Sequence, residues 1–361
     1  MRIVTQELLR YQWHDKPPFG ELLTMKILFQ IIAKSLVFAV IFCISDVILA
    51  ANPPVIQTSL PKKQASLIVE QQTQEVDKRP VISEVALSYD GRLMATAGDD
   101  HYVRIWDAKT GRLMHEFLAH DDWVRGVAFS PMSDRIVTIG QDGKIKIWNL
   151  ASLGTSTLIG EKVPGARKLV FSPDGTKFAV CGFDPVVCCF DMASQKLLYR
   201  LSAPSESMSA LQFSPDATLL AAGGRNGMVR IWRLDIGNVV TNIRGDGRRV
   251  NALAFNSDGS QLALGTNGSR ITIWNPKSGQ QISALPERYG KTFSLQYCGG
   301  GILASGESDN VIRLWDLNGQ REMTNLVGHT GTVSTLCFDE QLNSLVSGSF
   351  DTTIRYWAMV Q

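Results

Sequence analysis

The chain has 361 residues, of which 44% are hydrophobic, and its 36 basic and 34 acidic residues leave a formal net charge of +2. This composition supplies enough apolar residues for a large buried core and excludes an intrinsically disordered chain. The near balance of charge also lacks the basic excess typical of a general nucleic-acid binder, so we expect a globular domain that does not bind nucleic acid.

Residues 1–51 have the pattern of a leader. A positively charged start after Met25 precedes an apolar run, which Asp46 interrupts, and small residues ending at Ala51 come before a proline-rich break. This pattern matches a secretory signal, whereas the uninterrupted stretch is short for a membrane-spanning helix of about 20 apolar residues. We therefore expect a protein exported to the periplasm or another extracytoplasmic compartment, after cleavage of the leader. A membrane anchor through residues 26–51 and a cytoplasmic protein are the alternatives, and Met25 is a candidate for the true start.

An aromatic residue recurs every 41 or 42 residues, at Trp106, Trp148, Phe190, Trp232, Trp274, Trp315 and Trp357. Each aromatic ends a short β-branched run, and a small-residue strand and a tight turn come before that run. A further strand upstream often ends in a turn close to the Ser-Pro-Asp-Gly of residues 172–175. Four short strands per repeat, patterned with a period of two residues, predict an all-β radial array with seven blades.

These repeats resemble those of the WD40 family over roughly residues 66–358, since the aromatic is usually Trp followed by Asp or Asn. In two repeats a His lies 22 residues before an Asp and 28 residues before the Trp. The resemblance implies one hydrogen-bonded tetrad in each, formed by His120, Thr138, Asp142 and Trp148 and by His329, Ser347, Asp351 and Trp357. Such networks are physically reasonable because buried indole and imidazole N–H groups need partners.

The other repeats have lost the histidine, which is replaced by Lys78, Lys162, Pro204, Asp246 and Glu287. The position of the tetrad Asp is held by Asp100, Asp184, Asn226, Gly268 and Asp309. We therefore expect these five blades to depend on packing more than on a complete hydrogen-bond network.

The last repeat ends at Ala358 and leaves no residues for a fourth strand. A lone strand-like run at residues 66–71 precedes the first repeat. We predict that this run completes the last blade, so that the ring closes and leaves no blade unfinished. The domain organisation is then a leader, a linker at residues 52–65 that contains three prolines, and a propeller at residues 66–361 that we expect to be monomeric.

The sequence lacks the catalytic motifs that we sought, including the nucleophile elbow, the H-E-x-x-H zinc motif, the phosphate-binding loop and the dinucleotide glycine fingerprint. It also lacks metal-binding cysteine spacing, so we expect no catalysis, no cofactor and no metal. Cys181 and Cys188 flank a predicted hairpin turn. They leave two alternatives, a disulfide across the hairpin or two buried thiols.

Trp123 is the only tryptophan of the repeats that is not a blade aromatic. In the WD40 family, which the chain resembles, two positions of each repeat face the ring surface that most often binds partners. They are the loop that corresponds to the one holding Trp123 and the residue just before the tetrad Asp. The resemblance therefore implies a binding face whose candidate residues are Trp123, Phe183, Arg225, Arg249 and Phe350. These residue types are enriched at protein interfaces or among their hot spots.

From these features we expect a non-catalytic scaffold that presents one propeller face to a protein partner. The alternatives are a propeller enzyme similar to lactonase-type hydrolases, a small-ligand binder that uses the central channel, and the sensor part of a larger assembly. A hydrolase of that kind is expected to gather charged or His residues at the channel mouth and to lack Trp-Asp strand ends. The sequence does not identify the partner, its pathway or the face that binds it.

Overall fold

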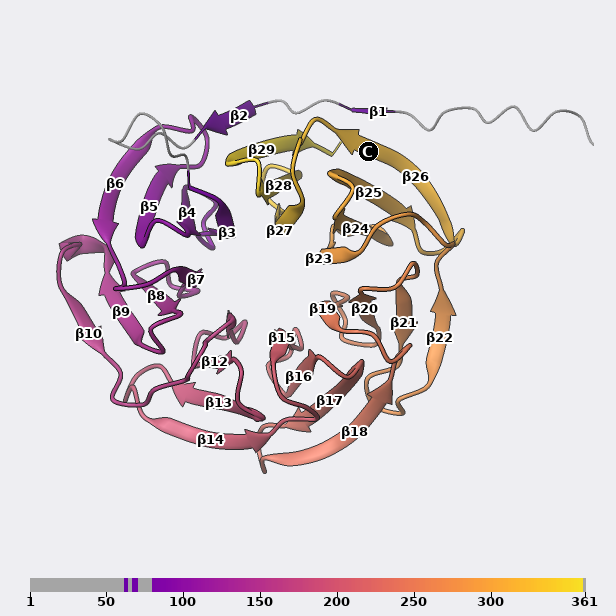
Figure 1. The fold of residues 1–361 in the computed structure, drawn as a ribbon, viewed down its shortest axis with the longest axis horizontal. Coiled ribbons are helices and arrows are strands. Elements are labelled where there is room, and N and C mark those ends of the chain that lie inside the picture. The colour runs from indigo at the N-terminus through magenta and orange to yellow at the C-terminus, as the bar shows by residue number, and fades with distance from the viewer. Residues whose placement is uncertain (1–61, 64–66, 71–79, 360–361) are drawn as a thin grey trace, which may run out of the picture. The chain divides into compact units, whose positions relative to one another are not determined.

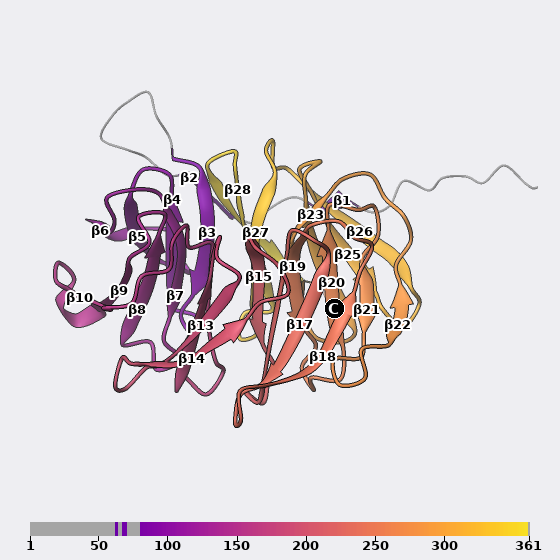
Figure 2. The ribbon, with the colours of Figure 1, turned by 60° about the horizontal axis from the view of Figure 1, so that its bottom comes forward.

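The computed structural model describes residues 62–63, 67–70 and 80–359, so the predictions for the leader lie outside the described residues. Within these ranges the strands form seven sheets, which stand as blades around a central axis (Figure 1). Figure 2 shows inner strands such as β3, β7 and β15 running through the thickness of the ring. The prediction of an all-β, seven-bladed propeller is confirmed. No helix in the described ranges is long and apolar enough to cross a membrane.

Blades 1 to 4 each have four strands in chain order from the channel outward. They are Ile82–Leu87 (β3), Leu93–Gly98 (β4), Tyr102–Asp107 (β5) and Leu113–Leu118 (β6) in blade 1; Val124–Phe129 (β7), Arg135–Gly140 (β8), Ile145–Asn149 (β9) and Ser156–Leu158 (β10) in blade 2; Lys168–Phe171 (β11), Lys177–Cys181 (β12), Val186–Asp191 (β13) and Leu197–Ser202 (β14) in blade 3; and Met208–Phe213 (β15), Leu219–Gly224 (β16), Met228–Arg233 (β17) and Asn238–Arg244 (β18) in blade 4. One 3-10 turn, Leu150–Ser152, follows β9.

The remaining three blades complete the ring. They are Val250–Phe255 (β19), Leu262–Thr266 (β20), Thr272–Trp274 (β21) and Gln281–Ala284 (β22) in blade 5; Thr292–Tyr297 (β23), Ile302–Glu307 (β24), Val311–Asp316 (β25) and Arg321–Val327 (β26) in blade 6; and Val333–Asp339 (β27), Ser344–Ser349 (β28) and Thr353–Ala358 (β29) in blade 7.

The core consists of one buried apolar cluster between each pair of neighbouring blades. The second strand of each blade is covered on both faces, and in β16 all of the residues, which are Leu, Ala and Gly, are buried. Small residues suit this position because a sheet packs against it from each side. The blade aromatic then fills the wider space further from the axis, as Trp232 and Trp315 do with 1% and 0% of their surface exposed.

Ring closure occurs as the sequence predicts. Leu67–Glu70 (β2) pairs antiparallel with β29, with Leu67 opposite Tyr356 and Glu70 opposite Thr353, and supplies the fourth strand of blade 7. Blade 7 also shares a buried cluster with blade 1. Within the predicted linker, Lys62–Lys63 (β1) pair parallel with β26 at the outer edge of blade 6.

The disulfide alternative for Cys181 and Cys188 is wrong. Cys181 pairs across the hairpin with Val187, and Cys188 pairs with Val180, so the two cysteines are offset by one residue. A one-residue offset places side chains on opposite faces of a sheet. Cys181 accordingly packs between blades 3 and 4, whereas Cys188 packs between blades 2 and 3. Both thiols are free and buried.

Candidate functional site

The first strand of most blades carries a β-bulge at its second residue. In blade 2, for example, the register shifts between Val124 and Gly126, which leaves Arg125 without a partner on β8. A bulge bends the strand and re-aims the side chain of the extra residue. We call the seven equivalent positions the bulge ring: Ser83, Arg125, Arg167, Ser209, Asn251, Phe293 and Ser334. Arg167 belongs to the ring by position, immediately before β11.

In four blades the bulge-ring side chain binds the next blade. Ser83 donates to the carbonyl oxygen of Val124 at 2.7 Å, and Ser209 donates to that of Val250 at 2.7 Å. Asn251 and Ser334 make the same kind of bond to the following blade, at 2.9 and 2.8 Å. A short polar side chain at this position therefore has a structural role, because it ties neighbouring blades together.

Arg125 and Arg167 break this pattern in blades 2 and 3. The Arg125 guanidinium lies over the Trp123 ring, 4.5 Å from its centroid, and its Nε donates to Gln141 Oε1 at 2.9 Å. The Arg167 guanidinium lies over the Phe183 ring, also 4.5 Å from the centroid. Stacking on an aromatic face attracts the cation and restricts its orientation. The two blades thus present cation–aromatic pairs where other blades form inter-blade bonds.

Further contacts connect Phe183 to Arg249 of blade 5. Gly165 has φ +56, and a Cβ at this glycine would lie 1.7 Å from Phe183 Cδ2, so only glycine allows the ring to lie there. The backbone N–H of Ser207 donates to the Phe183 carbonyl oxygen at 2.8 Å. Arg249 Nη1 in turn donates to the carbonyl oxygen and to Oγ of Ser207, at 3.2 Å each.

We call Trp123, Arg125, Arg167, Phe183 and Arg249 the cation–aromatic cluster. Burial, followed by the charges of Arg249 and Arg125, lowers the pKa of Arg167 from its ordinary value of 12.5. Burial likewise lowers the pKa of Arg125, and the nearby carboxylates of Asp122 and Asp99 oppose that effect. Arginine keeps its charge in proteins because its ordinary pKa is so high. The cluster is therefore a concentration of positive charge on one face of the ring.

The structure exposes the aromatic residues that the sequence places on the binding face. Trp123, Phe183 and Phe350 have 43%, 47% and 46% of their surface exposed. Phe350 lies in blade 7, and Arg225 is exposed in the turn between β16 and β17. In the part of the chain that the structure describes, neither side chain has a hydrogen bond or ring contact with the cluster. The geometry thus brings together three of the five candidates.

Arg125 and Arg167 are not among the candidates predicted from the sequence. Those candidates lie in loops, whereas these two residues lie at the start of the inner strand. The signal that could have found them is the contrast within one repeat position, where Ser or Asn occurs in four blades and Arg in two. A long charged side chain at this position stacks on an aromatic ring in each of the two blades and makes no bond to the next blade.

Both predicted tetrads form hydrogen-bonded networks. In blade 2, His120 Nδ1 lies 3.0 Å from Asp142 Oδ1, and Thr138 Oγ1 lies 2.8 Å from His120 Nε2 and 3.0 Å from Trp148 Nε1. In blade 7 the corresponding distances are 2.8, 2.7 and 2.8 Å, with Ser347 Oγ as the central hydroxyl. Each hydroxyl joins the imidazole to the indole, so these residues hold the loop to the strands and do not line a reaction site.

The expectation that the other five blades depend mainly on packing is wrong for blade 6. There Trp315 Nε1 donates to Ser305 Oγ at 2.9 Å, and Ser305 Oγ donates to Glu307 Oε1 at 2.8 Å. Arg288 and Arg313 both pair with the fully buried Glu307 carboxylate. The ion pairs replace the His–Asp pair, because Arg288 occupies the loop one residue after the predicted position.

Blades 1 and 3 show the two extremes. In blade 1, the buried Arg104 forms ion pairs with Asp100 and Glu116, each at 2.6 Å. In blade 3, Phe178 stacks on Phe190 with centroids 4.9 Å apart, and the network is replaced by packing as the sequence predicts.

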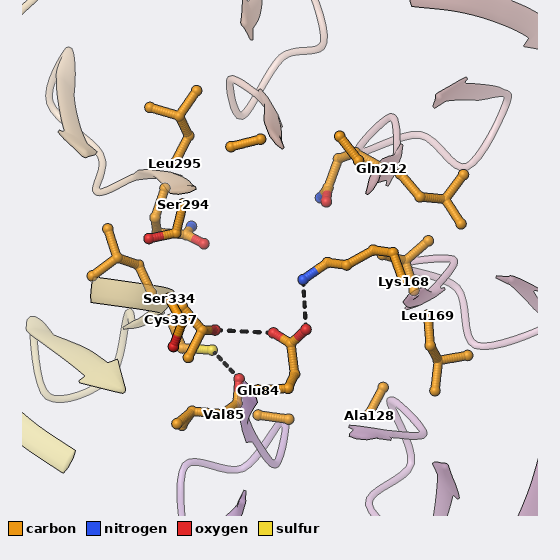
Figure 3. Close-up of a pocket in the computed structure, with 18 of the residues that line it drawn as sticks. Glu84, Val85, Ala128, Lys168, Leu169, Gln212, Ser294, Leu295, Ser334 and Cys337 are labelled. Carbon is orange, nitrogen blue, oxygen red and sulfur yellow. Dashed lines mark hydrogen bonds and ion pairs between the residues drawn. The ribbon is translucent and has the colours of Figure 1, made fainter. Parts of the chain in front are cut away.

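The central channel contains a cavity of about 390 Å³ that the inner strands line. Figure 3 shows Glu84 of blade 1 and Lys168 of blade 3 pointing toward each other across it, with Lys168 Nζ 2.6 Å from Glu84 Oε2. Gly126 holds the same position in the blade between them and has no side chain to separate them. Thr335 of blade 7 donates to Glu84 Oε1 at 2.9 Å. The acid–base groups of the channel are therefore paired with each other.

This pairing makes the channel a weak candidate for catalysis. Burial disfavours the charged form of Lys168, but the ion pair with Glu84 outweighs burial and raises the pKa of Lys168. A protonated amine is neither a nucleophile nor a general base. Cys337 Sγ lies 3.0 Å from the Val85 carbonyl oxygen, and burial raises its pKa to about 12, so its reactive thiolate is scarce. Among the described residues no group of three or more His, Cys, Asp or Glu could hold a metal ion.

Comparison with known proteins agrees with this geometry. The family model "WD domain, G-beta repeat" matches residues 71–107, 111–149 and 320–358. The model "Anaphase-promoting complex subunit 4 WD40 domain" matches residues 211–299. Together with the seven blades and the two tetrads, these matches define the chain as a WD40-repeat β-propeller. The chain belongs to the WD40-repeat family.

Individual relatives match only over short segments. The chain is 34% identical over 79 residues to nuclear distribution protein PAC1 of Gibberella zeae, a match that covers 22% of this chain and 16% of the relative. It is 34% identical over 74 residues to a WD repeat-containing protein 91 homolog of Dictyostelium discoideum, covering 20% of this chain and 10% of the relative. It is 32% identical over 77 residues to human WD repeat and SOCS box-containing protein 1, covering 21% of this chain and 18% of the relative. All three relatives are eukaryotic, and the matched segments span less than a fifth of their lengths.

Proposed function

We propose that this chain is a non-catalytic protein-interaction platform, and that its working face is the one that carries the cation–aromatic cluster. The observation that supports this most is the exposure of Trp123 and Phe183, two large aromatic side chains held in place by stacked arginines. Such residues supply contact area at low entropic cost, and Trp and Arg are enriched in binding hot spots. Membership of the WD40-repeat family supports a scaffold role, because the blades form a rigid frame and the loops carry recognition.

Cross-linked affinity purification of the full-length chain, from membrane and soluble fractions, tests the platform. A Trp123→Ala, Arg249→Ala double variant removes one aromatic and one arginine from the proposed face. Tyr89→Ala, Arg112→Ala is the matched control, because both residues are exposed in turns at the opposite ends of the strands.

We expect a specific partner to be recovered with the wild-type chain and with the control, and lost with the face variant. Equal recovery with both double variants would move the binding site to another surface. Recovery of no partner at all would favour a small ligand in the channel or an enzymatic role.

We further propose that the chain is an exported protein of the bacterial type, cleaved after the leader or tethered through residues 26–51. The support is the sequence of the leader alone, since the eukaryotic relatives do not bear on it. The five described cysteines are compatible with export, because burial raises their pKa values and leaves their thiols poorly reactive. N-terminal sequencing of the mature protein from fractionated cells tests this proposal. A mature chain that begins near Asn52 supports export, whereas an intact leader in the cytoplasmic fraction contradicts it.

A further inference from the structure

The three arginines of the cation–aromatic cluster have no ion pair with a carboxylate among the described residues. Several other arginines with comparable or greater burial, such as Arg104, Arg288 and Arg313, form such ion pairs, whereas the half-buried Arg230 also donates only to uncharged acceptors. Arg125 instead donates to the amide oxygen of Gln141, and Arg249 donates to Ser207. Both acceptors are uncharged. The positive charge of these two groups is therefore not cancelled by a paired carboxylate among the described residues.

Arg167 lies between them and has still fewer partners. Its guanidinium stacks on Phe183, and in the described part of the chain it has no hydrogen-bond acceptor. Arg125 and Arg249 are close enough for their charges to disfavour its protonation. The fold thus holds three like charges near each other, with the carboxylates of Asp122 and Asp99 opposing their repulsion only at Arg125, so a bound anion would lower the free energy of the cluster.

The aromatic rings restrict the orientation of two of these arginines, Arg125 and Arg167. A guanidinium stacked on a ring presents its N–H edge to solvent and loses less freedom when a planar anion arrives. Carboxylates match that edge with two parallel hydrogen bonds. We propose that Arg125, Arg167 and Arg249 bind carboxylate side chains of an acidic peptide segment, which crosses the face from blade 2 to blade 5 and belongs to the partner of the platform proposed above.

Two observations favour an acidic peptide over other polyanions. The ring faces of Trp123 and Phe183 are each already covered on one side by a guanidinium, which limits the stacking of unpaired bases that single-stranded nucleic acids need. Asp122 lies beside Trp123 and has no ion pair among the described residues, so it would repel a continuous anionic surface such as a membrane. A peptide can place its carboxylates at the arginines and leave out charge opposite Asp122.

Fluorescence anisotropy on the purified full-length chain tests the proposal. The probe is a labelled twelve-residue peptide of alternating Glu and Ser, and the matched neutral probe replaces each Glu by Gln. A twelve-nucleotide oligothymidine and vesicles with anionic phosphatidylglycerol serve as competing polyanions. The variants are Arg125→Gln and Arg167→Gln, with Arg112→Gln on the opposite face as the control. Thermal melts that match the wild type exclude misfolding as the cause of any loss.

We expect binding of the acidic probe that weakens with added salt, at least about tenfold weaker binding in each cluster variant, and no change in the control. Equal binding of the neutral probe, equal loss in Arg112→Gln, no binding of the acidic probe at 1 mM protein, or tighter binding of either competing polyanion would overturn the proposal. The platform itself is tested separately: a partner still captured through Trp123 when the acidic probe does not bind would refute the acidic segment and leave the platform standing.

Discussion

Replacing Thr138 by Val tests whether the blade 2 tetrad stabilises the ring through hydrogen bonds or through packing. Val keeps the volume of Thr but removes the hydroxyl that lies between His120 and Trp148. All three side chains are buried, with 0%, 1% and 4% of their surfaces exposed for Thr138, His120 and Trp148. The substitution leaves an imidazole nitrogen and an indole N–H without a partner, and each unsatisfied buried group costs about 1–3 kcal/mol.

We therefore expect Thr138→Val to destabilise the propeller by about 2–6 kcal/mol. At roughly 2 °C per kcal/mol for a domain of this size, the melting temperature should fall by at least about 4 °C. Thr138→Ser is the matched control, because it keeps the hydroxyl and loses only a methyl group, at a cost of about 1 kcal/mol. Calorimetry of both variants measures the difference. If Thr138→Val melts at or above the temperature of Thr138→Ser, packing dominates and the hydrogen-bond reasoning is refuted.

Deleting residues 66–71 should lower the melting temperature of the whole domain, because blade 7 would lose its fourth strand; an unchanged melt would sink the ring-closure account. Glu307→Gln should cost about 3–5 kcal/mol, since it leaves the buried Arg288 guanidinium without its carboxylate partner, whereas Glu287→Gln, at an exposed ion pair, should cost less than about 1 kcal/mol in the same denaturation assay. Similar costs for the two would show that the buried network contributes little. Stability should also fall as the pH drops below about 6.5, because burial lowers the pKa of folded His120 and the unfolded chain then binds more protons. A second loss should follow below about pH 3.8, because hydrogen bonds from His329 and Thr353 outweigh burial and hold the pKa of Asp351 below its ordinary value. A melting temperature that does not change between pH 7 and pH 5, or that changes equally in His120→Gln, would contradict the first effect.

The repeat itself is the most predictable part of the molecule. Each blade buries the same positions, so the spacing of the aromatics determines the order and number of blades without any knowledge of contacts. The closing strand is predictable for the same reason, because a ring of complete blades requires one more strand than the last repeat contains. The tetrads follow from fixed His-to-Asp and His-to-Trp spacings in two repeats.

The networks outside the repeat pattern are less predictable. Blade 6 uses Arg288 and Glu307, each displaced from the tetrad positions that the spacing indicates, since loops of different length change which residue reaches the buried hydroxyl. Whether Cys181 lies opposite Cys188 also depends on a one-residue shift in the register of the two hairpin strands. The sequence of the four-residue turn does not specify that register. Arg125 and Arg167 lie at a bulge, and the consequence of a bulge for side-chain direction becomes visible only when the strands are paired.

Hydrogen exchange of the full-length chain, with and without its captured partner, tests the central claim most directly. If the cation–aromatic face is the working face, the partner should slow exchange in residues 120–125, 164–168, 182–184 and 247–251. Exchange in the turns at the opposite ends of the strands, such as residues 88–92 and 130–134, should stay unchanged. Protection confined to those opposite turns, or to the outer strands, would contradict the account.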